Sequence, residues 1–292
     1  MSRSLFLRIV DAVKDYDYYF QQQSDGLGRM RLSPLQKVTV VFRMLAYGLP
    51  VNTTDEYVKI ERYLRTPNAN DIARLLYIGR SGSPTIILEI VADYDLWIWY
   101  AYFGMSDTNN DINVLESSNL FFNLAQCIAP PAHYVIQGKE YNMGYYLADG
   151  IYPKWATIVQ TIQQPQSKKK NYFAMKHEAC RKDVERAFGV LQSRFAIVAG
   201  SARFWKKHVL HDIMTACIIM HNMIIEDERD VYAPIQEVRE APIPEVDIVA
   251  DETTRFTQFI TRYRQINDKD AHIALRNALI DHLWEEYTNS DS

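Results

Sequence analysis

Two neighbouring runs of β-branched and aromatic residues constrain this 292-residue chain more than any other feature. The runs are PTIILEIV (84–91) and LWIWYAYF (96–103), and the four residues Ala-Asp-Tyr-Asp separate them. Such runs on both sides of a short polar turn predict a β-hairpin. Because the segments before and after them have helical periodicity, the sequence predicts an α+β or α/β fold.

Helical signals flank the hairpin on both sides. The opening helix has one apolar face, made by Phe6, Ile9, Val10 and Val13. A second helix is expected from Ser33-Pro34 to Gly48, and a capping box at Thr53 begins a third helix that stops near Ile60. These short N-terminal helices fit a helix-turn-helix DNA reader or a small accessory bundle, and both remain open. Further helices are expected over 112–127, 176–195, 208–225, 255–266 and 270–287.

A short strand and the strongest helix carry two carboxylates of interest. Alternation in residues 141–153 places Tyr145, Leu147 and Asp149 on one face of a strand that stops at Gly150. The helix over 176–195 carries Glu185 beside an apolar stripe, and Gly189, one turn later, leaves open space next to it. The stripe consists of Cys180, Val184, Phe188, Leu191 and Phe195.

Asp149 and Glu185 are separated by 35 residues and could converge to hold Mg²⁺, which prefers oxygen ligands. Two carboxylates are too few for a two-metal phosphodiester cleavage site. In the alternative interpretation, which the pattern alone favours, Asp149 begins a turn and Glu185 pairs with Arg181 one helical turn earlier. His221 is expected to be a packed histidine, because it lies in a very apolar helix.

The charge of the chain is unevenly distributed. Residues 168–208 contain eleven Lys and Arg against three acids, whereas residues 226–252 contain ten acids against two Arg. A basic stretch in a chain of net charge −4 indicates a polyanion site, although a solvated helix face gives the same pattern. The segment 229–254 is rich in Pro, Val and acids and is expected to be a linker.

Cysteine usage and hydropathy indicate a soluble intracellular protein. Cys127, Cys180 and Cys217 are odd in number and widely spaced, so we expect buried thiols in a reducing compartment. The N-terminus lacks the apolar core of a signal peptide, and no run approaches the roughly 18 apolar residues of a membrane span.

Four ordered segments closely match a known pattern: TIILEIVADYDLWIWYAYFG (85–104), NNDINVLE (109–116), YNMGYYLADGIYPKWATIV (141–159) and RKDVERAFGVLQSRFAIV (181–198). With them, the chain resembles the plant transposon proteins of the PIF/Harbinger superfamily. The resemblance extends from the first residues to MIIEDERD (223–230).

The resemblance implies an RNase H-like core whose Asp, Asp and Glu residues act with Mg²⁺ or Mn²⁺ to nick DNA and join strands. Asp149 matches the second Asp, in its Asp-x-x-Tyr context, and Glu185 matches the Glu of the Glu-Arg-x-Phe-Gly motif. Asp111 matches a recurrent acid with a supporting role at most. Such proteins are nuclear, with the cytoplasm as a second compartment, and they work with a separate DNA-binding partner.

Two departures from the family pattern bear on activity. Relatives have a Gly-Ser-x-Asp-Cys-Met-His-Trp type motif before PTIILE that supplies the first catalytic Asp, and here Gly79 runs directly into Arg80 without it. Another gap falls between Ile60 and Glu61, where relatives complete the helix-turn-helix-like region. The first Asp is carried by a central strand, which pairs with the strand ending at Asp149, so that central strand is expected to be missing.

The resulting hypothesis is a transposase-derived, divalent-metal-dependent nuclease that is impaired or inactive. Lys168, Lys169 and Lys170, expected in the loop before the strong helix, are its candidate DNA contacts. The first alternative is a non-catalytic DNA- or protein-binding remnant, and the second is an unrelated carboxylate-pair hydrolase such as a glycosidase. The expected segments are a helical region (1–79), an incomplete nuclease domain (80–228), an acidic linker (229–254) and C-terminal helices (255–292).

Overall fold

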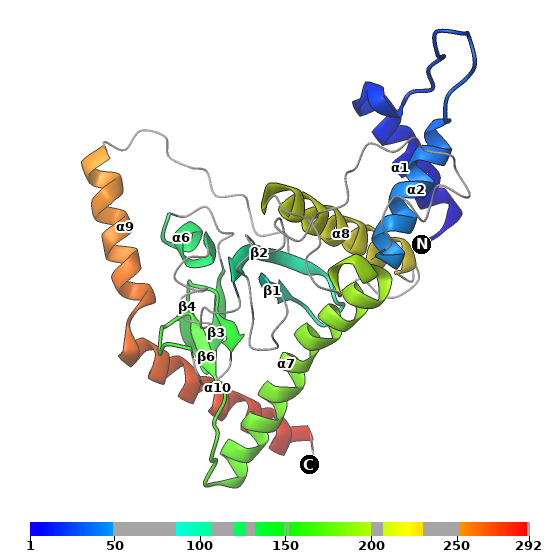
Figure 1. Cartoon of the computed structure of the whole chain (residues 1–292). Helices are drawn as coiled ribbons and strands as arrows, with labels where there is room; N and C mark the ends of the chain where they lie inside the picture. Colours follow the sequence, from blue (N-terminus) through cyan, green and yellow to red (C-terminus); the bar gives the residue numbers. More distant parts are fainter. Residues whose placement is uncertain are drawn as a thin grey trace. The chain divides into compact units, whose positions relative to one another are not determined.

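The computed structural model describes residues 1–48, 86–106, 119–126, 132–148, 150, 152–199, 207–229 and 252–290 (Figure 1). The chain divides into two compact units. Unit 1 comprises Met1–Thr108 and Val184–Ala233, and unit 2 comprises Asn109–Asp183 and Pro234–Ser292. Each unit has its own buried apolar residues, so each is described separately.

Both predicted N-terminal helices are present in unit 1, and the second begins and ends where the sequence predicts. Helix α1 (Arg3–Tyr16) is capped by the Ser2 hydroxyl, and a short 3₁₀ helix η1 (Tyr18–Phe20) follows it. Helix α2 (Pro34–Tyr47) has a reciprocal capping box between Ser33 and Gln36. It ends at Gly48, whose φ of 62° lies in the left-handed region that favours glycine. The predicted third helix near Thr53 lies outside the described residues.

The predicted hairpin is confirmed by β1 (Ile86–Ala92) and β2 (Ile98–Ser106), which pair antiparallel. Asp93 orders its turn by accepting hydrogen bonds from the Trp97 backbone N–H at 3.0 Å and from the Trp99 indole at 2.8 Å. Asn222 of α8 (Lys207–Glu228) holds both backbone groups of Ile98, at 3.0 and 2.9 Å. These two bonds attach α8 to the hairpin (Figure 1).

Helix α8 and the second half of α7 (Lys168–Arg194) supply half of the buried core residues of unit 1. A 3₁₀ helix η3 (Ala196–Val198) follows α7. By length and mean hydropathy alone, His208–Glu228 could cross a membrane, and it is the one such helix in the described part of the chain. Its buried side chains pack in the core, as expected of a core helix. The buried core consists of Leu5, Leu45, Ile90, Ile98, Ala187, Leu191, Phe195, Cys217, Met220 and Ile224.

Unit 2 is built around two short parallel strands. Strands β5 (Tyr146–Ala148) and β6 (Ile158–Gln160) pair in parallel, whereas β3 (Tyr134–Ile136) and β4 (Lys139–Tyr141) form an antiparallel pair. The helices of this unit are α6 (Asn119–Ala125), the first half of α7, α9 (Glu252–Ile266) and α10 (Lys269–Ser290). The predicted C-terminal helices are thereby confirmed.

Strand β6 is the most buried strand of unit 2. Ile158 is 1% exposed and packs with Phe121 of α6 and Ile266 of α9. Its neighbour Val159 is fully buried and packs in a second cluster with Phe173 of α7 and Leu275 of α10. Because successive residues of a strand point to opposite faces, β6 is covered on both sides.

Three expectations about this region are wrong. Helix α7 begins at Lys168 rather than at 176, because the Ser167 hydroxyl accepts a hydrogen bond from the Lys170 N–H at 3.3 Å. Cys180 is exposed rather than buried, because it lies between the α7 residues that pack in unit 2 and those that pack in unit 1. Leu147 is 37% exposed, because Tyr146 and Ala148 on the opposite face of β5 are the residues that pack inward.

Candidate functional site

The predicted carboxylates are only partly within the described residues. Glu185 lies on the exposed side of α7, in the part that belongs to unit 1. A Cβ atom built on Gly189 would meet nothing within 4 Å, so the space predicted beside Glu185 is present. Asp149 and Asp111 lie outside the described residues, and their convergence with Glu185 stays a prediction.

Arg181, the predicted structural partner of Glu185, contacts a different acid. Its guanidinium donates to both oxygens of Glu178 at 3.3 Å. This hydrogen bond is the main cause that lowers the pKa of the Glu178 carboxyl. The predicted pairing of Arg181 with Glu185 stays a prediction, because each of these two residues also makes a further interaction.

Two other acids near the hairpin have structural partners. Asp93 is held by Trp97 and Trp99 in the turn, and Asp95 lies 3.7 Å from the Arg229 guanidinium. These contacts give both acids structural roles in unit 1. Within the described ranges, no group of three or more His, Cys, Asp or Glu side chains is arranged to hold a metal ion.

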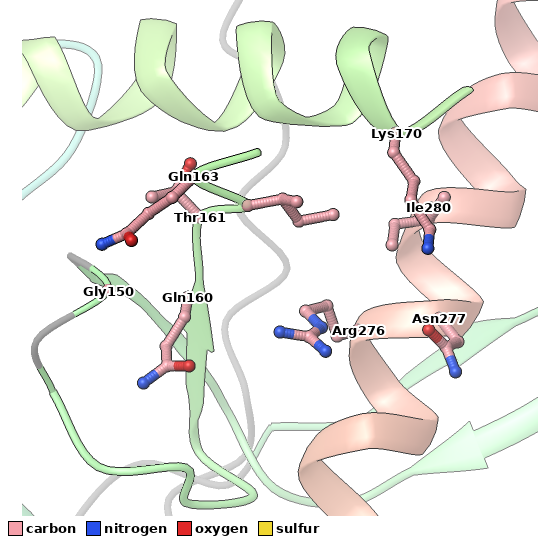
Figure 2. Close-up of a pocket in the computed structure, with 9 residues that line it drawn as sticks. Gly150, Gln160, Thr161, Gln163, Lys170, Arg276, Asn277 and Ile280 are labelled. Carbon is pink, nitrogen blue, oxygen red and sulfur yellow. The ribbon is translucent and has the colours of Figure 1, made fainter. Parts of the chain in front are cut away.

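A cavity of about 310 Å³ opens in unit 2 at the carboxyl end of β6 (Figure 2). In sheets with parallel strands, ligands bind at the carboxyl ends of the strands. Gly150, which directly follows the predicted ligand Asp149, is part of its wall. The cavity is lined by Gly150, Gln160, Thr161, Ile162, Gln163, Lys170, Arg276, Asn277 and Ile280.

Among the described residues, the polar lining of this cavity contains two cations, three amides and the Thr161 hydroxyl, and no carboxylate. Figure 2 shows Lys170 extending from α7, and Arg276 from α10, into the space beside β6. The Arg276 Nε atom is buried, and no hydrogen-bond partner lies within reach of it among the described residues. A buried donor of this kind is rare in folded proteins and is normally satisfied by water, an ion or a ligand.

Gly150 allows the Gln163 side chain to lie close to the backbone in the cavity wall. A Cβ atom at this position would lie 2.9 Å from the Gln163 side-chain nitrogen. Any larger residue would therefore displace the Gln163 amide. The Gln160 amide is 5% exposed and donates to the Tyr152 carbonyl, which fixes it at the end of β6.

The three predicted DNA-contacting lysines have different surroundings. Lys169 forms an ion pair with Asp281 of α10, so its charge is already neutralised within unit 2. Lys170 lines the cavity, and Lys168 is exposed at the first position of α7. Of the three, Lys170 thus has the surroundings best suited to an anion.

Two buried histidines hold β6 in position. The His177 Nε2 atom lies 2.8 Å from the Val159 carbonyl, and the His272 Nδ1 atom lies 2.7 Å from the Ile158 carbonyl. Because a carbonyl only accepts, each of these ring nitrogens carries a proton. The two imidazoles therefore serve as structural donors to β6, from α7 and from α10.

His221 in unit 1 is a packed histidine, as predicted. It is fully buried, and its Nε2 donates to the Leu96 carbonyl at 2.8 Å, which leaves Nδ1 to accept from Arg194 at 3.4 Å. Burial is the main cause that lowers its pKa, against the opposing effect of the Leu96 carbonyl.

Sequence reasoning missed the polar residues of the cavity. Arg276 and Asn277 lie on a C-terminal helix that the sequence predicted only as amphipathic, and no motif marks them. The sequence contains a weak signal that Gln160 and Gln163 line a ligand site. They lie at the end of a buried strand and in the polar loop after it, in the order strand, polar loop and helix.

The comparisons with known proteins identify the origin of the chain. The family described as plant transposon protein matches residues 77–232, which is more than half of the 292 residues. The chain belongs to this plant transposon protein family. The resemblance inferred from the four sequence segments is thereby confirmed at the level of the family. Neither the curated proteins nor the solved structures gave a match to this transposon protein.

Proposed function

We propose that this transposon protein is a transposase-derived DNA nuclease of the PIF/Harbinger type that still binds DNA and whose metal-dependent cleavage is impaired. The single observation that carries the proposal is the family match over residues 77–232, which includes Asp149 and Glu185. The first catalytic Asp is absent from this chain, because LYIGRSGSP (76–84) contains no acid.

The order of elements supports an RNase H-like core. A hairpin, β1–β2, precedes a parallel pair, β5–β6, and a long helix, α7, follows. The hairpin belongs to unit 1 and the parallel pair to unit 2. A missing central strand accounts for this division, because that strand would join the two strand pairs into one sheet.

In this proposal Asp149 and Glu185 would hold Mg²⁺ or Mn²⁺, with Asp111 in a supporting role. Carboxylates are the ligands these cations prefer, and the exposed position of Glu185 beside the open space at Gly189 fits such a role. Bound metal would supply Lewis-acid stabilisation of a phosphodiester oxygen.

DNA binding is supported by the charge of α7. The helix contains eight Lys and Arg against three acids, and exposed Lys168, Lys176 and Lys182 are distributed along it. Such an excess of cations attracts phosphates in a salt-dependent manner. By family resemblance we place the protein in the nucleus with a separate DNA-binding partner.

The test combines DNA binding with plasmid nicking. Fluorescence anisotropy on a labelled duplex should show affinity that falls with salt, with a slope of about −0.9 per neutralised phosphate. Supercoiled plasmid with Mg²⁺ or Mn²⁺ should be nicked slowly, and Asp149→Asn or Glu185→Gln should remove that nicking. Glu178→Gln, which changes an acid on the same helix, is the matched control and should leave nicking intact.

Each outcome decides a different part of the proposal. Nicking that persists in both Asp149→Asn and Glu185→Gln would contradict the site assignment. Absence of salt-dependent DNA binding would contradict the proposed function as a whole.

A second function, a non-catalytic DNA-binding remnant, is favoured by the missing Asp motif. It would be established if the chain bound DNA without any metal-dependent nicking.

Sequencing the transcript across the codons for Ile60 to Pro84 tests whether the Asp motif is absent. A longer product that restores an Asp-Cys-Met-His-like motif would favour a three-acid nuclease, whereas a product identical to this sequence would favour the remnant.

A further inference from the structure

We infer that the cavity at the carboxyl end of β6 is a phosphate-binding site in which Arg276 of α10 and Lys170 of α7 hold the oxyanion. This inference rests on the proposed function for the identity of the phosphate, a phosphodiester of bound DNA. The cavity itself lies wholly within unit 2.

The first argument is the unmatched positive charge. Lys170 and Arg276 line one cavity, and no Asp or Glu is among the described residues of its wall, so these residues leave the two charges unneutralised. The neighbouring Lys169 provides the contrast, because it is paired with Asp281. An oxyanion in the cavity would remove the repulsion between two like charges and gain charge-assisted hydrogen bonds.

The second argument is the unsatisfied donor. The Arg276 Nε atom is buried without a hydrogen-bond partner among the described residues, although a guanidinium offers five N–H donors in a fixed fork. That fork matches the geometry of two phosphate oxygens. A bound phosphate would therefore give the Arg276 side chain the acceptors that it lacks.

The third argument is the chemistry and size of the remaining wall. The side-chain amides of Asn277, Gln160 and Gln163 provide further donors, while Ile162 and Ile280 contribute apolar surface. A volume of about 310 Å³ is large enough for a phosphate group with its attached sugar, at the lower end of small-ligand sites. The described part of the wall thus combines hydrogen-bond donors with cations, which favours an anion.

The position of the cavity makes DNA the favoured source of the phosphate. Gly150 in its wall directly follows Asp149, the predicted metal ligand. A phosphodiester held here would belong to the same DNA strand that the predicted nuclease site engages. Helix α10 would then be part of the DNA-binding surface, a role the family resemblance does not assign to it.

The experiment uses the full chain and three variants: Lys170→Ala with Arg276→Ala, Asn277→Asp, and Lys269→Ala as a control. Lys269 lies on the same helix as Arg276 but does not line the cavity, so Lys269→Ala lowers the net charge by one, as Asn277→Asp does, without changing the site. Circular dichroism verifies folding. Asn277→Asp places a negative charge in the wall at an exposed position and is expected to fold normally.

Two probes distinguish the source of the phosphate. In the first arm, a labelled DNA duplex is titrated at several salt concentrations. The double variant should reduce the salt slope by about 2, that is about 1 per cation, and Asn277→Asp should weaken binding about tenfold or more. The slope of Lys269→Ala should stay closer to that of the wild-type chain than the slope of the double variant does.

In the second arm, inorganic phosphate is added at millimolar concentrations without DNA, and thermal unfolding is measured. Phosphate should raise the Tm of the wild-type chain and of Lys269→Ala, but not that of the double variant. If only this arm responds, the site takes a free phosphate and the DNA assignment is wrong. If neither arm distinguishes the cavity variants from Lys269→Ala, the inference is overturned.

The two arms also separate this inference from the proposed function. A wild-type chain that does not bind DNA contradicts the proposed function, while the phosphate arm still tests the cavity. A wild-type chain that binds DNA equally well after the cavity substitutions contradicts only the site.

Discussion

His272 joins α10 to the most buried strand of unit 2, and its removal should destabilise that unit strongly. The side chain is 1% exposed, and its Nδ1 donates to the Ile158 carbonyl at 2.7 Å, with the Trp155 carbonyl at 3.1 Å. His272→Ala leaves a buried carbonyl without its donor, which costs about 1–3 kcal/mol. It also empties the space of an imidazole ring, and deletions of this size in a core cost about 2–5 kcal/mol.

The two effects overlap, since relaxation around the cavity lets water reach the carbonyl, so we expect a total loss of about 3–5 kcal/mol. His272→Asn tests the cause. The side-chain nitrogen of Asn occupies nearly the position of Nδ1 and can donate to the same carbonyl, so this variant should recover part of the loss. His282→Ala changes a half-exposed histidine on the same helix and should stay within about 0.5 kcal/mol of the wild type.

The assay is urea unfolding followed by tryptophan fluorescence and by circular dichroism. Trp155 and Trp284 report on unit 2, whereas Trp97 and Trp99 report on unit 1, so unequal transitions would reveal separate unfolding of the units. Equal stability of His272→Ala and His282→Ala would refute the structural role of His272. Equal loss in His272→Ala and His272→Asn would show that packing alone, and not the hydrogen bond, holds α10 to β6.

Three further predictions concern unit 1 and α7. Because burial lowers the pKa of His221 in the folded state, the unfolded state binds its proton first. Stability should therefore be fully present above about pH 6.5 and fall as the pH drops below it, and His221→Gln should flatten this dependence in urea titrations at pH 5 to 8. Leu191→Ala removes a fully buried side chain and should cost about 2–5 kcal/mol in unfolding free energy, whereas Gln192→Ala, which changes an exposed neighbour, should cost little; equal losses would contradict the packing of α7. A thiol reagent should modify exposed Cys180 rapidly and buried Cys217 slowly, because burial raises the pKa of the Cys217 thiol to about 12; mass spectrometry of the labelled peptides checks the order, and faster labelling of Cys217 would contradict it.

Elements with local signals could be predicted from the sequence. Ser33, Pro34 and Gly48 fix the ends of α2 through capping and backbone geometry, which act within a few residues. The hairpin followed from two β-rich runs around a turn that Asp93 orders. His221 was identified as a packed residue, because one apolar helix surrounds it in the sequence.

Features that depend on distant segments could not be predicted in this way. Cys180 belongs to an apolar stripe by periodicity, yet α7 contributes to two separate cores and Cys180 lies between the two contributions. The cavity combines Gly150, Lys170 and Arg276, which are far apart in sequence, and its burial of the Arg276 Nε atom arises only when α10 packs against β6. The start of α7 was missed for a local reason, because the capping role of Ser167 was not recognised.

The hydrogen bonding of the parallel strands indicates where the central strand expected of an RNase H-like sheet would pair. Both backbone groups of Ile158 in β6 are occupied, since His272 donates to the Ile158 carbonyl and the Ile158 N–H donates to the Trp155 carbonyl at 3.1 Å. Within the described ranges, β5 pairs with β6 on one side only. A restored strand would therefore pair with β5, the strand that leads to Asp149, and would place its own Asp beside the predicted metal ligand. The C-terminal helices α9 and α10, in contrast, pack against β6, so they stabilise unit 2 whether or not such a strand is present.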